Sequence, residues 1–408
     1  MIKIAILGFG VVGEGVAEVI ASNQAEIAAY VGDSVAVSHI LDRRTFPDSP
    51  YGDLVTDDFE RIVSDPEIAV VVETMGGVHP AYEFSIAAMN AGKSVVTSNK
   101  EVVAKCGIDL TACAKKNGVR YEFEASVGGG IPVLRSIRTS LAADKITKID
   151  GILNGTTNYI LTEMRDRSIS FADALAEAQT LGYAEKDPTA DVDGLDAQRK
   201  IIILTALATG VLLNESDVYA ETMTKITPAD ADAASRIGAS VKLIGSMRVT
   251  DGKISAFVSP RMVAHSSPLS RIDGVYNGIS VSSPITGDVM YYGRGAGRYP
   301  TAGAVVSDIT AVLSGAAEHE KKTDWRRPDD CEVLPLGEMK FRYYVRTKPE
   351  SVNEAFEAAV VSFGGADLVD GSPDGVLEFV TDEISESEAM KILSSGAFGE
   401  VESVIRML

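Results

Sequence analysis

Short apolar runs recur along the first third of the chain and are typical of buried strands. Residues 2–7 form an apolar run with a single lysine, and helical periodicity continues over residues 14–20. Similar runs predict strands over residues 35–41, 68–73, 93–97 and 121–125. Continuous apolar strands favour a parallel sheet that is buried on both faces, so we expect an α/β fold.

The pattern changes after residue 132. It predicts helices over residues 133–141, 159–164 and 171–181, and strands over 148–153, 253–263, 278–282 and 288–292. This order indicates an α+β domain with an antiparallel-leaning sheet. A further helix over residues 301–312 is expected to return to the first domain.

The last part of the chain follows a charged segment with two prolines, which is typical of a linker. Beyond it, the order strand, helix, strand, strand, helix, strand is predicted over residues 340–407. We therefore expect a first domain over residues 1–131 completed by a helix near 301–315, a second domain over 132–300, a linker over 316–338 and a small βαββαβ domain over 339–408.

The charge of the chain argues against several classes of partner. Its 38 Lys and Arg residues and 58 Asp and Glu residues give a net charge of −20, which disfavours nucleic acid and anionic membranes and leaves a small-molecule substrate. Three cysteines form an odd count without metal-ligand spacing, which favours the reducing cytoplasm. No apolar run approaches the roughly 20 residues of a membrane helix, and Gly8 interrupts the N-terminal run, unlike a signal peptide.

A glycine-rich turn joins the first strand to the first helix. Gly8 permits the tight turn, Gly10 lets the backbone approach a pyrophosphate, and Gly13 allows close packing of helix and strand. The helix N-terminus adds partial positive charge for the phosphates. This context predicts a Rossmann-type, doubly wound sheet that binds a dinucleotide at the turn. Phe9 and Val12 of the turn are also expected to contact the dinucleotide. The alternative is a tight turn without a ligand.

The second strand ends in Asp42, Arg43 and Arg44. An acidic residue at this point binds a ribose 2′-hydroxyl, whereas arginines bind a 2′-phosphate. Because both kinds are present, NAD and NADP stay open, and the two arginines favour NADP. The alternative for both arginines is a solvated turn.

Two further strand ends carry candidate residues for the cofactor. Thr74 follows the strand over residues 68–73, and Lys100 comes shortly after the strand over 93–97. Since ligands of open α/β sheets bind at the carboxyl ends of the strands, we expect Lys100 near the nicotinamide. The alternative is an ordinary solvated lysine.

Two glycine-rich segments and one helix start outside the first turn are further candidates for binding. Residues 128–130 could present carbonyls to a cation or form a hinge between domains, and the sequence alone favours the hinge. Residues 154–158 begin a helix, so the groups around Gly155 and Thr156 suit a substrate carboxylate. Residues 292–297, with Gly295, could close over a cofactor.

The run over residues 182–200 concentrates carboxylates directly ahead of the apolar residues 201–204. Asp196 and Lys200 are four residues apart and share a face if the segment is helical. Partial desolvation would make the Lys200 ammonium a proton donor. The alternative is a surface ion pair beside a solvated acidic loop.

Six motifs stand in a recognisable order along the chain. Five of them span residues 8–13, 97–100, 124–132, 154–158 and 292–297. The most specific is Ala178-x-x-x-Gly182-Tyr183-Ala184, followed by Asp187-Pro188-x-x-Asp191-Val192-x-Gly194-x-Asp196-x-x-x-Lys200. With these six motifs, residues 1–315 resemble homoserine dehydrogenase.

The resemblance implies oxidation of L-homoserine to L-aspartate 4-semialdehyde with NAD(P), or the reverse reduction, in threonine, methionine and isoleucine biosynthesis. Lys200 would be the proton donor and acceptor, and Lys100 would lie between cofactor and substrate. Glu185 would hold the substrate ammonium. The other substrate-binding positions would be Asp191 and Asp196, which orient the substrate, and Gly155, Thr156 and Tyr183.

The resemblance also implies a monovalent cation, usually sodium, and a homodimer formed through the central domain. The cation would be held mainly by the carbonyls of Glu124, Val127, Gly129 and Ile131. The last domain resembles an ACT domain, an amino-acid-sensing module. Residues 348–351, after its first strand, lack the glycine of the usual effector pattern, so a dimerising or merely packed module is the alternative to a threonine sensor.

Two other functions stay open on the same scaffold. One is a related NAD(P) oxidoreductase that acts on another aldehyde or amino acid. The other is a non-catalytic amino-acid sensor. A sensor has no need of a proton donor, so the presence of both Lys100 and Lys200 argues against it.

Overall fold

The computed structural model describes residues 1–320, 324–329 and 332–408. They form two compact units, one comprising residues 1–146, 202–214 and 283–328, the other 147–201, 215–282 and 329–408. Part of the predicted linker, residues 321–323 and 330–331 with Cys331, lies outside the described residues. Within the described part of the chain, no helix has both the length and the apolar character needed to cross a bilayer.

The first unit contains the predicted parallel sheet, which is confirmed. Its strand order is β3-β2-β1-β4-β5-β6, and all neighbours pair in parallel. The last strand is shorter than predicted, because a 3-10 turn over Glu124–Ser126 follows it at once. The strands are β1 (Ile2–Leu7), β2 (Val35–Leu41), β3 (Val55–Thr56), β4 (Ile68–Glu73), β5 (Ser94–Thr97) and β6 (Tyr121–Glu122).

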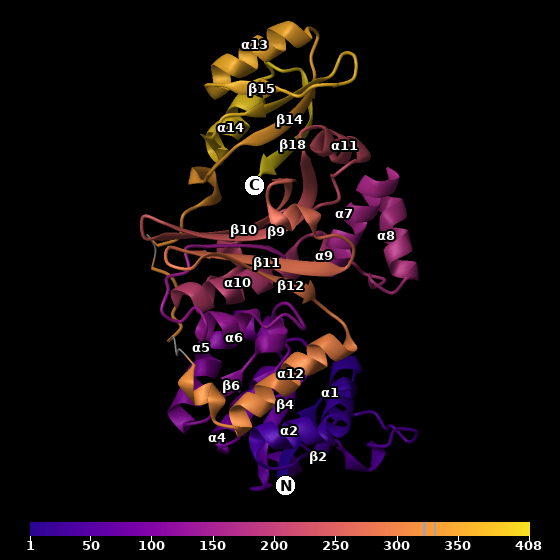
Figure 1. Cartoon of the computed structure of the whole chain (residues 1–408), viewed down its shortest axis with the longest axis vertical. Helices are drawn as coiled ribbons and strands as arrows, with labels where there is room; N and C mark the ends of the chain where they lie inside the picture. Colours follow the sequence, from indigo (N-terminus) through magenta and orange to yellow (C-terminus); the bar gives the residue numbers. More distant parts are fainter. Residues whose placement is uncertain (321–323, 330–331) are drawn as a thin grey trace. The chain divides into compact units, whose positions relative to one another are not determined.

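Helices pack on this sheet around an apolar core. Ile4 and Val72 of the strands meet Val16 of the first helix and Val305 of the last. Helices α1 and α12 approach closely, as Figure 1 shows, because a Cβ added to Gly15 would lie only 3.2 Å from that of Ala302. The helices are α1 (Val11–Ser22), α2 (Gln24–Val31), α3 (Glu60–Val63), α4 (Ala81–Asn90), α5 (Lys100–Asn117), α6 (Val133–Arg138) and α12 (Arg298–Leu313), which follows strand β12 (Gly287–Arg294).

The helix predicted over residues 133–141 ends early, at Arg138. The N–H of Leu141 bonds to the carbonyl of Ser136, so the chain leaves the helical hydrogen-bonding pattern in this turn. The helix over residues 301–312 is present as α12, which begins at Arg298 and runs through Leu313.

The second unit contains the predicted antiparallel sheet. The strands β7 (Lys148–Ile152), β9 (Ala239–Thr250), β10 (Lys253–Ala264) and β11 (Tyr276–Ser283) lie in the order β11-β7-β9-β10, and short β8 (Tyr219–Ala220) pairs with β10. Strand β9 was not predicted. It forms a hairpin with β10 through Asp251 and Gly252, which both have positive φ, the backbone of a two-residue hairpin turn.

The helices of this region bring the chemically interesting residues together. They are α7 (Gly155–Arg167), α8 (Phe171–Thr180), α9 (Thr189–Val192), α10 (Leu195–Thr209) and α11 (Pro228–Arg236). Asn154 caps α7 by accepting the N–H of Thr157 at 2.9 Å. Helix α10 begins inside the polar run and continues through residues 201–207, which are all buried. The segment that contains Asp196 and Lys200 is therefore helical, as their shared face requires.

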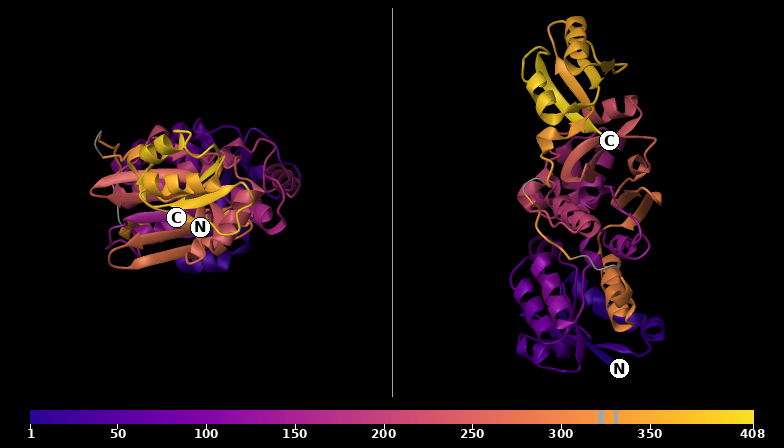
Figure 2. Two further views of the ribbon diagram at one scale, coloured as in Figure 1. Left: turned by 90° about the horizontal axis from the view of Figure 1, so that it is seen from above. Right: turned by 90° about the vertical axis from the view of Figure 1, so that its left-hand side faces the viewer.

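The C-terminal elements follow the predicted order of strands and helices. They are β14 (Tyr343–Lys348), α13 (Val352–Phe363), β15 (Ala366–Leu368), β16 (Leu377–Thr381), α14 (Glu386–Leu393) and β18 (Glu400–Met407), with a small ribbon of β13 (Lys340–Phe341) and β17 (Ile384–Ser385). Their strand order is β18-β14-β16-β15, with antiparallel neighbours. Strand β18 also pairs in parallel with β10, so these residues extend the sheet of the second unit (Figures 1 and 2).

Candidate active site

The glycine-rich turn has the geometry of a phosphate-binding turn. Gly8 has a φ of +91°, which only glycine adopts readily. A Cβ on Gly13 would lie 2.1 Å from the carbonyl oxygen of Gly8, so the start of α1 packs directly on the end of β1. A Cβ on Gly10 would meet nothing within 4 Å. The backbone at Gly10 is therefore open to a ligand, and the turn fits a dinucleotide pyrophosphate.

The end of β2 is tied to the same turn. The carboxylate of Asp42 accepts the N–H of Phe9 at 2.9 Å and is bound by the Arg44 guanidinium, whose Nη2 lies 2.8 Å away. Hydrogen bonds from Arg44 hold the pKa of Asp42 well below its ordinary value. Both arginines are exposed, and Arg44 is the one that pairs with Asp42. The two arginines that the sequence singled out therefore differ in their contact with Asp42 and not in their exposure.

Thr74 and Lys100 lie on neighbouring strand ends of the parallel sheet. The Thr74 hydroxyl donates to the carbonyl of Gly8 at 2.8 Å, so the residues after β4 contact the phosphate-binding turn. Lys100 is the first residue of α5 and is half-buried. Asn99 caps this helix by accepting the N–H groups of Glu101 and Val102.

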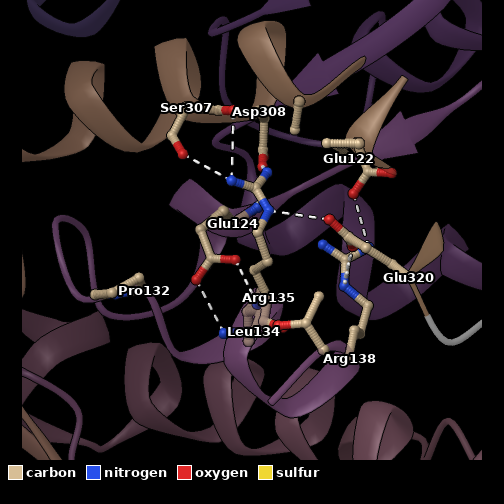
Figure 3. A network of polar contacts seen from close by, with 12 residues as sticks. Glu122, Glu124, Pro132, Leu134, Arg135, Arg138, Ser307, Asp308 and Glu320 are labelled. Atoms are coloured by element: carbon tan, nitrogen blue, oxygen red, sulfur yellow. Dashed lines mark hydrogen bonds and ion pairs between the residues drawn. The ribbon is translucent and has the colours of Figure 1, made fainter. Parts of the chain in front are cut away.

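A buried ionic network surrounds the start of the segment over residues 124–131 (Figure 3). The Glu124 carboxylate caps α6 by accepting the N–H groups of Leu134 at 2.9 Å and Arg135 at 2.6 Å. The Arg135 guanidinium in turn binds Asp308 and Glu320. Burial raises the pKa of Asp308, which the ion pair with Arg135 opposes. The network fixes the shape of this segment from within the first unit.

The segment over residues 124–131 contains two glycines with positive φ angles, which residues with a side chain rarely adopt. Gly128 and Gly129 have φ angles of +76° and +53°, and a Cβ on Gly129 would lie 2.6 Å from the carbonyl of Gly295. The glycine loops that contain Gly129 and Gly295 are therefore in contact. These glycines lie within the first unit, whose first segment runs through Ile146, and the hinge interpretation stays a prediction.

A cavity of about 420 Å³ adjoins this segment. Among the described residues there is no cluster of three or more His, Cys, Asp or Glu that could hold a metal ion. The cavity is lined by Glu124, Gly130, Ile131, Pro132, Arg135, Arg294, Tyr299, Pro300, Gly303, Ala304 and Ser307.

The second unit holds Lys200 in a buried polar cluster. Its ammonium donates to the carbonyl of Leu153 at 2.6 Å and to Asp196 at 2.8 Å. The side-chain amide of Asn154 bridges two carboxylates, donating to Asp191 at 2.7 Å and to Asp196 at 2.8 Å. Lys200 is 8% and Asp196 4% exposed. The alternative of a surface ion pair is therefore wrong.

The start of α7 adjoins this cluster. Gly155 follows Asn154 and packs so closely that a Cβ would lie 2.6 Å from the carbonyl of Val275. The Thr156 hydroxyl donates to the carbonyl of Tyr183 at 2.6 Å, which holds the polar run against the helix start. The exposed side chain of Glu185 lies two residues further on. Helix N-termini bind anions through their free N–H groups.

The predicted residues are divided between the two units: the phosphate-binding turn, Lys100 and the segment over residues 124–131 lie in the first, and the cluster around Lys200 lies in the second. The sequence interpretation treated Asn154 only as a helix cap, and it missed the bridge to both aspartates. The spacing of Asn154 and Thr157 in the sequence is typical of a helix cap, but the two aspartates that accept from the Asn154 amide lie 37 and 42 residues away in the chain. It also passed over the buried Glu73 at the end of β4, which looked like the last residue of an apolar strand.

A dinucleotide-binding sheet and a buried lysine–carboxylate cluster define an NAD(P)-dependent oxidoreductase. Profiles described as "Homoserine dehydrogenase, NAD binding domain" and "Homoserine dehydrogenase" match residues 8–124 and 132–310 of the chain. The chain belongs to the homoserine dehydrogenase family.

Individual relatives agree with this assignment. A homoserine dehydrogenase of Synechocystis is 37% identical, covering 100% of this chain and 99% of that protein, and one of Pseudomonas aeruginosa is 39% identical over 85% and 81%. The crystal structure of a homoserine dehydrogenase from Thiobacillus denitrificans matches with a TM-score of 0.90 and 33% identity, covering 100% and 98%. A hyperthermophilic archaeal homoserine dehydrogenase in complex with NADPH matches with a TM-score of 0.65 and 28% identity, covering 76% and 97%.

Proposed function

We propose that the chain interconverts L-homoserine and L-aspartate 4-semialdehyde, with Lys200 as the proton donor and acceptor at the reacting oxygen. The buried ion pair of Lys200 and Asp196 beside the start of α7 carries this proposal. The nicotinamide supplies and accepts the hydride. Reduction of an aldehyde builds negative charge on its oxygen, and an ammonium stabilises that charge and delivers a proton.

The substrate is an amino acid, and the site carries groups for both of its charges. The N–H groups at the start of α7, around Gly155 and Thr156, suit the carboxylate. Glu185 pairs with the ammonium from the exposed turn after Tyr183. Asp191 and Asp196, held by the Asn154 amide, orient the substrate.

Lys100 acts from the first unit, between the nicotinamide and the substrate. Its place at the start of α5, after the end of β5, supports this role because ligands of such sheets bind at the carboxyl ends of strands. The proposal requires that Lys100 and Lys200 face one substrate, although they lie in different units of the chain.

NADP is the proposed cofactor, although Asp42 also suits the ribose hydroxyls of NAD. Both arginines are exposed, but the Arg44 guanidinium is paired with Asp42, so Arg43 is the arginine proposed to bind a 2′-phosphate. The archaeal relative solved with NADPH supports this choice. The cofactor contacts would come from the turn over residues 8–13, from Thr74 and from the loop with Gly295.

A sodium ion is proposed at the segment that contains Gly128 and Gly129. Their positive φ angles give this stretch a fixed, irregular backbone, and carbonyl oxygens are suitable ligands for such a cation. The proposed ligands are the carbonyls of Glu124, Val127, Gly129 and Ile131. Bound there, the ion would brace the contact between the Gly129 and Gly295 loops.

We propose a first domain over residues 1–131 completed by the helix near 301–315, a second domain over 132–300, a linker over 316–338 and a last domain over 339–408. The protein is proposed to be a cytoplasmic homodimer. The order β18-β14-β16-β15 of the last part supports an ACT-like module, because it is the strand order of a βαββαβ ferredoxin-like fold. Residues 348–351 have no glycine, so a dimerising role is proposed in preference to threonine binding.

One spectrophotometric assay tests the proposal: homoserine with NAD or with NADP, with and without sodium and threonine. Homoserine-dependent reduction of the cofactor, faster with NADP and dependent on sodium, is the expected result. Turnover of other amino alcohols but not homoserine would point to a related oxidoreductase. No homoserine-dependent reduction under any condition would point to a non-catalytic amino-acid sensor.

A further inference from the structure

A buried carboxylate that the proposed mechanism does not use lies at the carboxyl edge of the parallel sheet. Glu73 is the last residue of β4 and has no exposed surface. The strand register places it between Leu7, the last residue of β1, and Thr97, the last residue of β5. Because strand order reverses between β1 and β4, Glu73 lies beside the switch point where sheets of this kind bind ligands.

The Glu73 carboxylate accepts hydrogen bonds from two different segments. Oε1 accepts the N–H of Met75 at 2.7 Å, and Oε2 accepts the hydroxyl of Thr97 at 2.6 Å. The Thr97 oxygen in turn accepts the N–H of Asn99 at 2.9 Å. A single carboxylate therefore connects the turn after β4 with the segment that leads into α5.

Asn99 continues this connection in two directions. Its Oδ1 caps α5, and its Nδ2 donates to the carbonyl of Gly77 at 2.6 Å. Lys100 is the next residue and begins the helix. The start of α5 and the turn over residues 74–77 are thus held to each other at Glu73 and again at Asn99.

The same turn also contacts the phosphate-binding turn. The Thr74 hydroxyl donates to the carbonyl of Gly8 at 2.8 Å. The side chain of Met75 lies so near that a Cβ on Gly8 would be 2.9 Å from its Cγ. Any displacement of the residues after β4 would therefore be transmitted to the backbone around Gly8.

The chemistry of the buried group is unusual for a purely structural position. Burial raises the pKa of Glu73, while the hydrogen bonds from Thr97 and Met75 favour its ionised form. An apolar side chain would fill the same volume without the cost of desolvating a carboxylate. The carboxylate is useful only for the hydrogen bonds that it accepts.

We propose that Glu73 is a positioning residue that holds Lys100 and the phosphate-binding turn in one fixed arrangement for hydride transfer. The proposal rests on the proposed function, because it takes Lys100 to act beside the nicotinamide. Without the carboxylate, the start of α5 and the turn over residues 74–77 would keep the hydrogen bond between Asn99 and Gly77 but lose the connection through Glu73 and Thr97.

A double-mutant cycle on the full-length chain tests this relationship. The variants are Glu73→Gln, Lys100→Met and the combination, each assayed for kcat with homoserine and NADP. Glu73→Gln is expected to lower kcat roughly 10- to 100-fold, the loss that misplacement of a reacting group produces, and to have little further effect once Lys100 is replaced. An equal loss in both backgrounds would overturn the proposal, because Glu73 would not then act through Lys100.

Thr97 offers a second test that leaves Glu73 unchanged. Thr97→Val removes the hydroxyl and is expected to reproduce the loss of kcat, whereas Thr97→Ser keeps the hydroxyl and should restore it. Ser85→Ala, which removes a buried hydroxyl on α4, is the folding control. A lowered Tm with unchanged kcat in Glu73→Gln and Thr97→Val would assign the network a structural role alone and overturn the proposal.

The two possible failures are distinguishable. Wild-type turnover in Lys100→Met would contradict the role of Lys100 in the proposed function, and the inference would fall with it. Impaired turnover in Lys100→Met with wild-type kcat in both Glu73→Gln and Thr97→Val would leave the proposed function intact and remove only the role of Glu73.

Discussion

The Lys200 ammonium lies 2.8 Å from the Asp196 carboxylate, one turn earlier on α10, and both side chains are buried. Four-residue spacing is common on helix surfaces, where such pairs contribute little. Here the same spacing produces a desolvated ion pair, because the following residues of α10 are apolar and buried and the Asn154 amide donates a hydrogen bond to the Asp196 carboxylate. Because the ion pair is buried, Lys200 and Asp196 are candidates for a catalytic role.

Replacement of Lys200 should separate chemistry from cofactor binding. Lys200→Met and Lys200→Ala are expected to lower kcat by roughly 10²- to 10⁴-fold, the usual contribution of a general acid. The dissociation constant of NADPH, measured by its fluorescence, should change little, because the phosphate-binding turn lies in the other unit. Lys186→Met, an exposed lysine of the same polar run, is the control. Near wild-type turnover in the Lys200 variants would remove Lys200 from the mechanism.

The buried pair of Asp196 and Lys200 should also contribute measurably to the free energy of unfolding. Asp196→Asn removes the carboxylate that pairs with the buried Lys200 ammonium, and removal of one partner of a buried pair costs about 3–5 kcal/mol in the free energy of unfolding. The double variant Asp196→Asn/Lys200→Met is expected to lose less than the sum of the single changes. Denaturant unfolding of all four proteins measures this coupling.

A surface pair with the same spacing provides the comparison. Glu101 and Lys105 form an ion pair on α5 at 2.7 Å, with both side chains partly exposed. The corresponding cycle there should give a coupling of about 1 kcal/mol or less. Equal coupling energies at the two sites would contradict the expectation that burial strengthens the interaction between Asp196 and Lys200.

Two glycines of the same turn should respond oppositely to alanine. Gly13→Ala would drive a methyl group to 2.1 Å from the carbonyl of Gly8, so it should lower the Tm. Gly10→Ala has open space and should leave the Tm unchanged, yet the methyl group would occupy the room left for the pyrophosphate and raise the KM of the cofactor. A Gly10→Ala enzyme with wild-type KM would show that the pyrophosphate does not bind at this turn.

The two arginines after β2 should differ in their effect on cofactor preference. Arg43→Ala should lower kcat/KM for NADP roughly 10-fold or more, the value of a charge-assisted contact to phosphate, and leave NAD turnover nearly unchanged. Arg44→Ala should affect both cofactors, because Arg44 orients Asp42, which accepts the N–H of Phe9. Kinetics of both variants with both cofactors measure the ratio. Equal losses for NAD and NADP in Arg43→Ala would contradict the assignment.

Much of the first unit was predictable from local patterns. The apolar runs predicted the strands, and the spacing of Gly8, Gly10 and Gly13 predicted a close turn, because steric limits on the backbone act within a few residues. Prediction was poorer at the ends of elements, where local turns compete with the strand or helix. The strand at residue 121 stops after two residues, and α6 ends early, because the backbone groups that follow find partners in local turns.

The sequence by itself determined the family, the parallel sheet and the types of residue available for chemistry, because periodicity and motif spacing are local properties of the chain. Only the tertiary structure decided that Lys200 is buried, that Asn154 bridges two carboxylates, that Arg44 is bound to Asp42 and that Glu73 joins two segments of the site. These relations depend on which residues, far apart in the chain, come into contact in the buried interior. The burial of a side chain and its hydrogen-bond partners are set by the packing of whole helices and strands, so they cannot be predicted from a local sequence pattern.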